Sequence, residues 1–325
     1  MKKLLLLFAA LLAIVCLCSC HNAPKETPAT DFEYKLSDDG QSVYITKYIG
    51  TSQNVVVPAE IDGKKVFSIL FTGSGIPGSG AFEGSNVRSV TLPDTVLGIG
   101  RYAFRDCKEL TEIKVSKNLR GIGGRAFQGC INLKTVDFSK TALKDMDGGV
   151  FEDCTGLEHI ALPETLVEIG AITFRNCSSL LEIDLPNGLQ KIGRAAFSYC
   201  SSLKTIRVPT SLDLKFMSSE SVFYETPVLE KIIFKDGWED LDGFYGYFSI
   251  SSNPQIIIPK STKRFSTLPF MIMGGCSARF VFEGDCPEII EPTSFYSAPT
   301  IYYHPEAKGW DDCAWVGVYE MIPIK

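Results

Sequence analysis

The chain has 325 residues, 45% of them hydrophobic and 22% charged, so it is long and apolar enough to bury a sizeable core. Its 32 basic and 38 acidic residues give a net charge of −6. An acidic balance of this kind argues against a nucleic-acid partner and against a polybasic surface that binds membranes.

The first 19 residues have the pattern of a secretory signal. Two lysines precede an apolar run over residues 4–17, which is too short to span a bilayer comfortably. The sequence Leu17-Cys18-Ser19-Cys20 resembles a bacterial lipobox, so we expect residues 1–19 to be removed and Cys20 to be lipidated. The lipid chains would then hold the protein on a membrane. An ordinary signal peptide that merely contains cysteines is the alternative.

Residues 20–31 are polar, contain two prolines and have little to bury, which predicts a flexible tether. Residue 21 is His and not Asp, which by analogy with Gram-negative lipoproteins does not favour retention in the inner membrane. We therefore expect an exported protein, lipid-anchored to the outer membrane and exposed at the cell surface. The sequence does not fix which way the anchored body faces.

Residues 32–80 are interpreted as an N-terminal β cap. The turn composition Ser-Asp-Asp-Gly-Gln at residues 37–41 separates two strand-like runs and predicts a β-hairpin. A stack of coils needs its first edge covered, because an open strand edge pairs with other chains. The Gly/Ser-rich residues 72–80 lack the Gly-Lys-Ser/Thr of a phosphate loop and are expected to be an insertion. A separate ligand-binding β domain is the alternative to a cap.

Residues 81–221 repeat one phrase. Five cysteines follow one another at intervals of 23, 24, 23 and 23 residues: Cys107, Cys130, Cys154, Cys177 and Cys200. Each follows an Ala-Phe or equivalent pair and precedes a Leu-x-x-Ile-x-Leu/Val segment, whose last two apolar residues lie on one side of a short strand. A second apolar pair then leads to a glycine such as Gly193, where the chain can bend.

One such coil cannot bury its own apolar face, so neighbouring copies must stack into a continuous core. The sequence therefore predicts a β-rich leucine-rich-repeat solenoid: right-handed stacked coils of about 23 residues with a parallel sheet along one face. Residues 222–325 contain short apolar segments typical of strands but lack the full repeat phrase. We interpret them as degenerate repeats with a C-terminal cap.

The phrase A-F-x-x-C-x-x-L-x-x-I-x-L-P-x-x-L-x-x-I-G, nearly complete at residues 173–193, resembles the BspA-like class of leucine-rich repeats. The similarity extends roughly over residues 81–308, and the N-terminal hairpin also resembles that family. Residues 304–310 resemble the family's closing phrase, which implies a short helix over the last coil. The resemblance implies a bacterial surface protein that binds other macromolecules.

The regularly spaced cysteines do not form a metal pattern, because their sulfurs would lie in a line along the stack and not converge on one point. We expect a ladder of buried thiols, with disulfides between adjacent coils as the alternative. Outside the ladder, a Cys276–Cys286 disulfide is conceivable, and the redox state of Cys313 is open. None of the three histidines stands in a recognisable catalytic context, so we expect no catalytic residues, no cofactor and no metal.

The residues on either side of each central strand residue should point away from the core and form a candidate binding face. That face comprises Glu112, Lys114, Thr135, Asp137, His159, Glu182, Asp184, Thr205 and Arg207. Its charge is mixed, so no simple polyanion is indicated, and a merely solvated surface is the alternative. A second candidate is an aromatic patch of Trp238, Tyr245 and Tyr247, which would contact sugar rings or protein unless it packs beneath its own coil.

These observations favour a non-catalytic cell-surface lipoprotein that presents its solenoid for protein binding, in adhesion or surface scaffolding. The partner implied by the resemblance is a protein of a host or a neighbouring cell. The alternatives are a carbohydrate-capturing surface lipoprotein for nutrient acquisition and, more remotely, an enzyme within residues 238–313. An exposed aromatic platform would favour the sugar ligand, whereas a packed one would favour protein binding through the sheet face.

Overall fold

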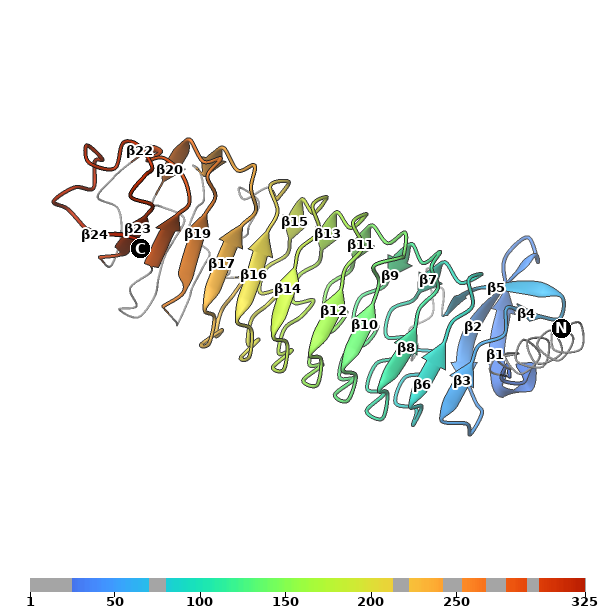
Figure 1. Ribbon diagram of the computed structural model, residues 1–325. Coiled ribbons are helices and arrows are strands. Elements are labelled where there is room, and N and C mark those ends of the chain that lie inside the picture. Colours follow the sequence, from blue (N-terminus) through green and yellow to red (C-terminus); the bar gives the residue numbers. More distant parts are fainter. Residues whose placement is uncertain are drawn as a thin grey trace, which may run out of the picture.

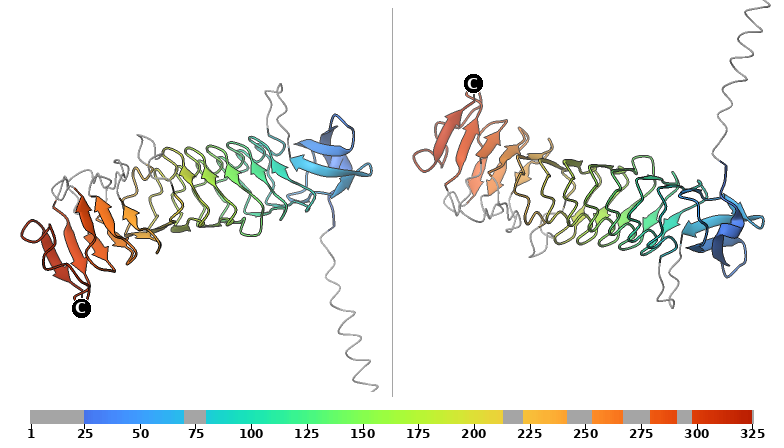
Figure 2. Two further views of the ribbon diagram at one scale, coloured as in Figure 1. Left: turned by 90° about the horizontal axis from the view of Figure 1, so that it is seen from above. Right: turned by 90° about the horizontal axis from the view of Figure 1, so that it is seen from below.

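The computed structural model describes residues 25–69, 80–212, 222–241, 253–266, 279–290 and 298–324. The chain forms one row of stacked coils that runs from the N-terminal cap to the C-terminal end (Figure 1). Views from above and below show the same single row (Figure 2). Within the described residues the helix content is one three-residue turn, η1 (Ala29–Asp31). The predicted β solenoid is confirmed.

Parallel strands, one from each coil, form what we call the front sheet. In order along the stack they are β3 (Asn54–Val56), β6 (Ser89–Thr91), β8 (Glu112–Lys114), β10 (Thr135–Asp137), β12 (His159–Ala161), β14 (Glu182–Asp184), β16 (Thr205–Val208), β17 (Lys231–Phe234), β19 (Gln255–Ile258), β21 (Arg279–Phe282), β23 (Thr300–Tyr303) and β24 (Glu320–Pro323). Their hydrogen-bonded ladders run in three groups, β3–β8, β10–β12 and β14–β24. The front sheet thus continues through the degenerate repeats.

A second set of shorter strands, the back sheet, comes from the second apolar pair of each coil. It contains β5 (Lys64–Ile69), β7 (Gly98–Ile99), β9 (Gly121–Ile122), β11 (Asp145–Met146), β13 (Glu168–Ile169) and β15 (Lys191–Ile192), followed by a separate group of β18 (Asp240–Leu241), β20 (Arg264–Ser266) and β22 (Glu288–Ile290). Within each group the strands pair in parallel, so both apolar pairs of the repeat phrase produce strands.

The N-terminal cap contains the predicted hairpin. Strands β1 (Phe32–Leu36) and β2 (Ser42–Tyr48) pair antiparallel, and β4 (Glu60–Ile61) also pairs antiparallel with β5. Because β2 pairs in parallel with β5, and β5 with β7, the cap is continuous with the back sheet of the stack. This arrangement gives the first regular coil a covered edge, which limits pairing with other chains.

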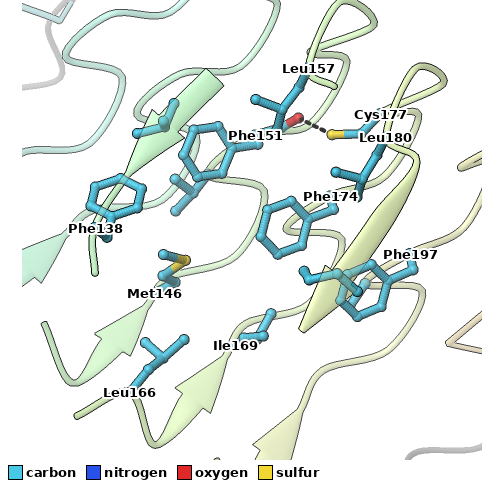
Figure 3. Close-up of a cluster of buried hydrophobic side chains, with 14 of the residues drawn as sticks. Phe138, Met146, Phe151, Leu157, Leu166, Ile169, Phe174, Cys177, Leu180 and Phe197 are labelled. Atoms are coloured by element: carbon cyan, nitrogen blue, oxygen red, sulfur yellow. Dashed lines mark hydrogen bonds between the residues drawn. The ribbon is translucent and has the colours of Figure 1, made fainter. Parts of the chain in front are cut away.

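The core of the solenoid is a column of stacked phenylalanines. From Phe82 to Phe223 successive ring centroids are 4.9–5.6 Å apart, and the ring planes differ by 2–16°. Figure 3 shows Phe151, Phe174 and Phe197 of this column among buried aliphatic side chains. The ring separation is close to the spacing of adjacent β-strands, so one Phe per coil fills the interior at the repeat of the sheets.

The cysteines of the repeats form a buried row beside the phenylalanines, and we call them the ladder thiols. All five are free and buried, and each Sγ donates to the carbonyl oxygen of the phenylalanine in the preceding coil, at 2.9–3.2 Å. Burial raises the pKa of the Cys107 thiol to about 11 and that of Cys200 to about 12, so both stay protonated donors at neutral pH. The predicted buried ladder is confirmed, and its hydrogen bonds are an addition to the sequence interpretation.

The glycines that follow the back strands β9, β13 and β15 are required by a close approach of adjacent coils. A Cβ atom on Gly193 would lie 2.3 Å from the backbone nitrogen of Ala171, and one on Gly170 would lie 2.6 Å from the carbonyl carbon of Asp147. Neither glycine has a positive φ. The expected bend is therefore present, but the glycine is needed for space rather than for conformational freedom.

At the C-terminal end two tryptophans cover the last coil. Trp310 packs against Phe282 and Tyr303 at centroid distances of 5.0 and 5.2 Å, and Trp315 is fully buried. Residues 304–319 form turns, so the short helix implied by the family resemblance is wrong for this chain. Cys20, most of the Gly/Ser-rich insertion, Tyr245, Tyr247 and Cys276 lie outside the described residues.

We expect Gly193→Ala to destabilise the fold by about 1–3 kcal/mol, because the added methyl group forces two backbones apart. Gly121 offers a matched control on the back sheet, since a Cβ there meets nothing within 4 Å and its φ is not positive. Gly121→Ala should change stability by no more than about 0.5 kcal/mol. Urea denaturation of both variants measures the difference, and equal midpoints would show that the coils do not require this close approach.

Candidate protein-binding face

The predicted binding-face residues lie together on the outward side of the front sheet. We call the residues before the central strand position the first column and those after it the second column. In-register pairing aligns the columns: Thr135 is opposite His159, and Asp184 is opposite Arg207. All nine predicted side chains are exposed or half-buried, whereas the central residues Ile113, Val136, Ile183 and Ile206 are buried.

On strands β8 to β16 this outward surface is polar and largely self-paired. Lys114 lies 3.6 Å from Glu112, and Arg207 lies 3.7 Å from Glu182. Lys235 reaches back to Asp184 at 2.8 Å and also donates to the Leu185 carbonyl oxygen at 2.7 Å. Surface ion pairs of this kind contribute at most about 1 kcal/mol each. The outward surface of these strands therefore carries charges of both signs, and neither sign dominates.

On strands β17 to β24 the second column becomes apolar. Its five members are in-register neighbours on adjacent strands, and all of them are half-buried: Ile233, Ile257, Val281, Tyr302 and Ile322. We call this row the apolar stripe. At the usual strand spacing it extends for about 20 Å. The first column beside it stays polar, with Lys231, Gln255, Arg279, Thr300 and Glu320.

The binding face predicted from the sequence ends at Arg207 and does not include this stripe, because the repeat phrase that aligns the columns fades after residue 221. A signal was nevertheless present. Residues 256–258 are three consecutive isoleucines. Successive strand residues alternate between faces, so one of the three had to point outward. An exposed apolar row with a polar border is typical of a surface that another protein covers.

The aromatic candidate has a different environment. Trp238 is only 9% exposed, and its ring lies 6.0 Å from that of Phe234 in a nearly perpendicular arrangement. At this position the side chain therefore packs beneath its own coil and offers no platform to a ligand. Tyr245 and Tyr247, which complete the predicted patch, fall in the part of the chain left undescribed.

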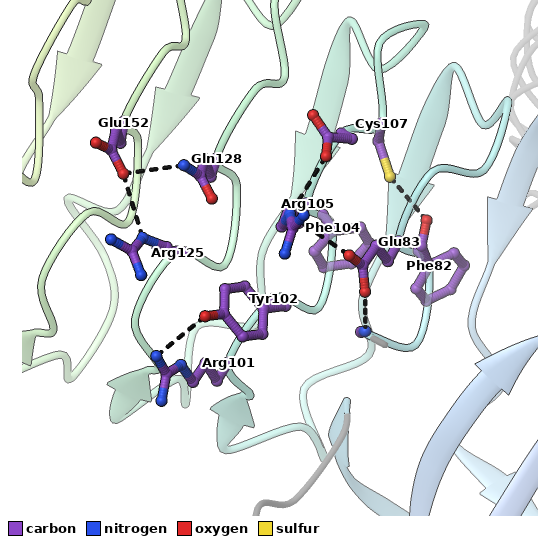
Figure 4. A network of polar contacts seen from close by, with 12 residues as sticks. Phe82, Glu83, Arg101, Tyr102, Phe104, Arg105, Cys107, Arg125, Gln128 and Glu152 are labelled. Atoms are coloured by element: carbon purple, nitrogen blue, oxygen red, sulfur yellow. Dashed lines mark hydrogen bonds and ion pairs between the residues drawn. The ribbon is translucent and has the colours of Figure 1, made fainter. Parts of the chain in front are cut away.

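A buried carboxylate joins three neighbouring coils on the turn side of the solenoid. Glu152 accepts hydrogen bonds from Arg125 at 3.2 Å, Gln128 at 2.9 Å and Arg175 at 3.1 Å, and the first two of these contacts are drawn in Figure 4. These donors occupy both carboxylate oxygens, which is the arrangement of a structural tie and not of a free acid or base. Within the described residues there is no group of three or more potential metal ligands.

Replacing Glu152 with Ala should cost about 1–3 kcal/mol, because the change leaves its partly buried donors without an acceptor. The loss falls toward the lower end, since Arg125 and Arg175 are 38% and 46% exposed and solvent screens their charges. Glu152→Gln keeps one acceptor oxygen and should cost less. Glu112→Ala, at an exposed ion pair, is the control. Thermal unfolding of the three variants decides the matter; equal losses for Glu152→Ala and Glu112→Ala would contradict the structural role.

Among the described residues, no helix has both the length and the apolar character needed to cross a membrane.

The chain has no significant match among curated protein sequences. Its fold does match solved structures. A leucine-rich repeat protein of T. pallidum is 30% identical, with 65% of this chain and 86% of that chain covered and a TM-score of 0.46. A leucine rich cell surface protein of Faecalibacterium prausnitzii is 18% identical, with 81% and 96% covered and a TM-score of 0.43.

The family comparison is the most extensive of these findings. The model of the BspA type leucine rich repeat region matches residues 76–181 and 167–300, in six copies. The matched stretches include the regular coils and most of the degenerate ones, which is more than half of the chain. The chain therefore belongs to the BspA-type leucine-rich repeat family.

Proposed function

We propose that this protein is a non-catalytic, lipid-anchored cell-surface protein that binds a protein of a host or a neighbouring cell through its front sheet. The apolar stripe carries this proposal. It presents Ile, Val and Tyr side chains on five adjacent strands, half-exposed and in register. Covering such a row removes apolar surface from water, which favours association.

The chemistry of the stripe suits a protein better than a sugar. Glycan sites combine polar groups with exposed aromatic rings, whereas Ile233, Ile257 and Val281 have no side-chain hydrogen-bonding group. Trp238, the described member of the proposed aromatic patch, is buried. A partner with a complementary apolar ridge would cover the stripe. The polar columns of β8–β16 would then form the rim, where charged groups contribute specificity more than affinity.

The proposed location rests on the N-terminal sequence and on the family. Residues 17–20 resemble a lipobox, and Cys20 is the residue that would carry the lipid. Membership of the BspA-type family supports placement at a surface. An anchor at Cys20 would leave the whole solenoid available for contact.

The binding prediction is tested with Val281→Glu, which puts a charge in the middle of the stripe. Biotinylated mature protein is incubated with surface-protein extracts of host epithelial cells and of co-resident bacteria, and in parallel with a glycan array. Binding of the protein partner should fall about tenfold or more, as at a central interface position. Ala161→Glu is the matched control, because Ala161 stands in the same column on β12, within the polar half.

Both variants must keep the wild-type melting temperature for the comparison to count. Undiminished capture by Val281→Glu would contradict the stripe as the contact surface. Binding to the glycan array, with none to protein, would instead support the carbohydrate-capturing alternative.

The anchoring prediction is tested by protease shaving of intact cells and by the variant Cys20→Ser. We expect external protease to digest the wild-type protein, and we expect Cys20→Ser to abolish labelling with radioactive palmitate and release the protein from the membrane fraction. An inner-membrane marker protein serves as the control for cell integrity. Complete protection of the wild-type protein in intact cells would exclude surface adhesion.

A further inference from the structure

We propose that Cys286 and Cys313 form a disulfide bond that fastens the C-terminal cap to the stack. Cys286 lies between β21 and β22, and Cys313 lies in the turns of residues 304–319, which we call the cap turn. The sequence interpretation considered Cys276 as the partner of Cys286. The structure instead places the cap turn, which carries Cys313, against the segment of Cys286, while the Cys286 thiol itself donates to the Pro287 carbonyl oxygen at 3.5 Å.

Several backbone contacts hold the cap turn against the segment around Cys286. The Cys286 N–H donates to the Lys308 carbonyl oxygen at 2.9 Å, and the Lys308 N–H donates to Asp285 at 2.8 Å. The Trp310 indole donates to the Gly284 carbonyl oxygen at 3.1 Å. Gly309 passes so close that a Cβ on it would lie 3.4 Å from the Cβ of Cys286. These contacts hold the cap turn, which carries Cys313, firmly against the segment of Cys286.

The pair differs from the ladder thiols in its chemistry. Each ladder thiol is bonded to a carbonyl oxygen and buried, and burial raises its pKa. In the pair, the interaction of the two side chains lowers the pKa of the Cys313 thiol to about 7 and raises the pKa of the Cys286 thiol. At neutral pH the pair can therefore hold one proton and one thiolate, the species that exchanges with disulfides. Cys286 is partly exposed, which gives a small disulfide access to the pair.

The oxidation is a thiol–disulfide exchange in two steps. The thiolate of the pair attacks one sulfur of a low-molecular-weight disulfide such as oxidised glutathione, which gives a mixed disulfide and releases one glutathione thiolate. The second cysteine loses its proton to solvent and attacks the protein sulfur of the mixed disulfide, and a second glutathione thiolate leaves. Two protein thiols are oxidised, and one small disulfide is reduced to two thiols. Oxidising extracellular compartments supply such oxidants.

The bond would act on the end of the apolar stripe. Strand β23 lies in the sequence between the two cysteines and carries Tyr302, while β24 follows the cap turn and carries Ile322. Fastening the cap turn to residue 286 limits local opening of these last two strands, because terminal elements of a stack are held from one side only. This consequence for binding rests on the proposed function, whereas the disulfide itself does not.

The test uses the full mature chain, reduced and then treated with oxidised glutathione at pH 7.5. Free thiols are alkylated in the folded state, and a non-reducing digest is analysed by mass spectrometry. We expect a linked peptide pair containing Cys286 and Cys313, two hydrogen masses lighter than the two reduced peptides. The five ladder thiols should be alkylated only after denaturation, which makes them an internal control. Recovery of Cys286 and Cys313 as separately alkylated peptides, or of Cys286 linked to Cys276 or to glutathione, would overturn the proposal.

Variants separate the bond from general effects on folding. Cys276→Ser should keep the linked pair, and Cys313→Ser should lose it. In the oxidised wild type, hydrogen exchange at β24 should be slower than in the reduced protein, and this difference should vanish in Cys313→Ser. If Cys313→Ser does not fold, the wild-type comparison of oxidised and reduced protein still decides the question. The disulfide and the proposed binding face can fail independently. If the linked peptide pair is found but Val281→Glu still captures the partner protein as the wild type does, the disulfide is supported and the binding face is contradicted.

Discussion

The constraint on which the whole structure depends is the fixed separation between coils. Hydrogen bonding between parallel strands sets it, and the interior must fill the same interval in every coil. The phenylalanine column does so, with centroids 4.9–5.6 Å apart from Phe82 to Phe223. The ladder thiols reinforce it, because a thiol is small enough to be buried and still able to satisfy the carbonyl oxygen of the preceding phenylalanine. A larger residue at that position would overfill the coil, and a smaller apolar one would leave the carbonyl oxygen without this donor.

Much of this architecture could be predicted from the sequence because each element of the phrase has one physical task in every copy. The cysteine spacing and the apolar offsets of residues 173–193 define the period, the front strand and the inward side chains without reference to distant residues, whereas the second apolar pair predicted a bend and not the back strand that it forms. Two features could not be predicted in this way. The close approach at Gly193 depends on the backbone of the coil before it, and sequence alone offers a bend as the simpler reason. The turns around Trp310, where the family resemblance implied a helix, pack that ring against Phe282 and Tyr303, which are contacts between residues distant in sequence or from another coil.

The candidate site was predictable in its regular half and hidden in its irregular half. Residues such as Glu112 and Arg207 could be placed on the outward face because their offsets from the repeat cysteines are constant. After residue 221 those reference points disappear, so the outward positions of Ile257, Val281, Tyr302 and Ile322 emerge only from the register of the strands. Trp238 shows the converse: an aromatic residue in an irregular stretch resembles a ligand platform until its packing against Phe234 is known.

Under the proposed function, the position of the apolar stripe within the row of coils would give the rest of the solenoid a mechanical role. Between the cap strand β3 and β17, where the stripe begins, there are seven strand intervals, or roughly 35 Å of stacked β structure. If Cys20 carries the proposed lipid, before the cap, the polar coils would act as a stiff arm that holds the proposed contact surface away from the lipid headgroups. The repeat number then sets the reach of the molecule, and gain or loss of one coil would change that reach by about 5 Å without altering the contact chemistry.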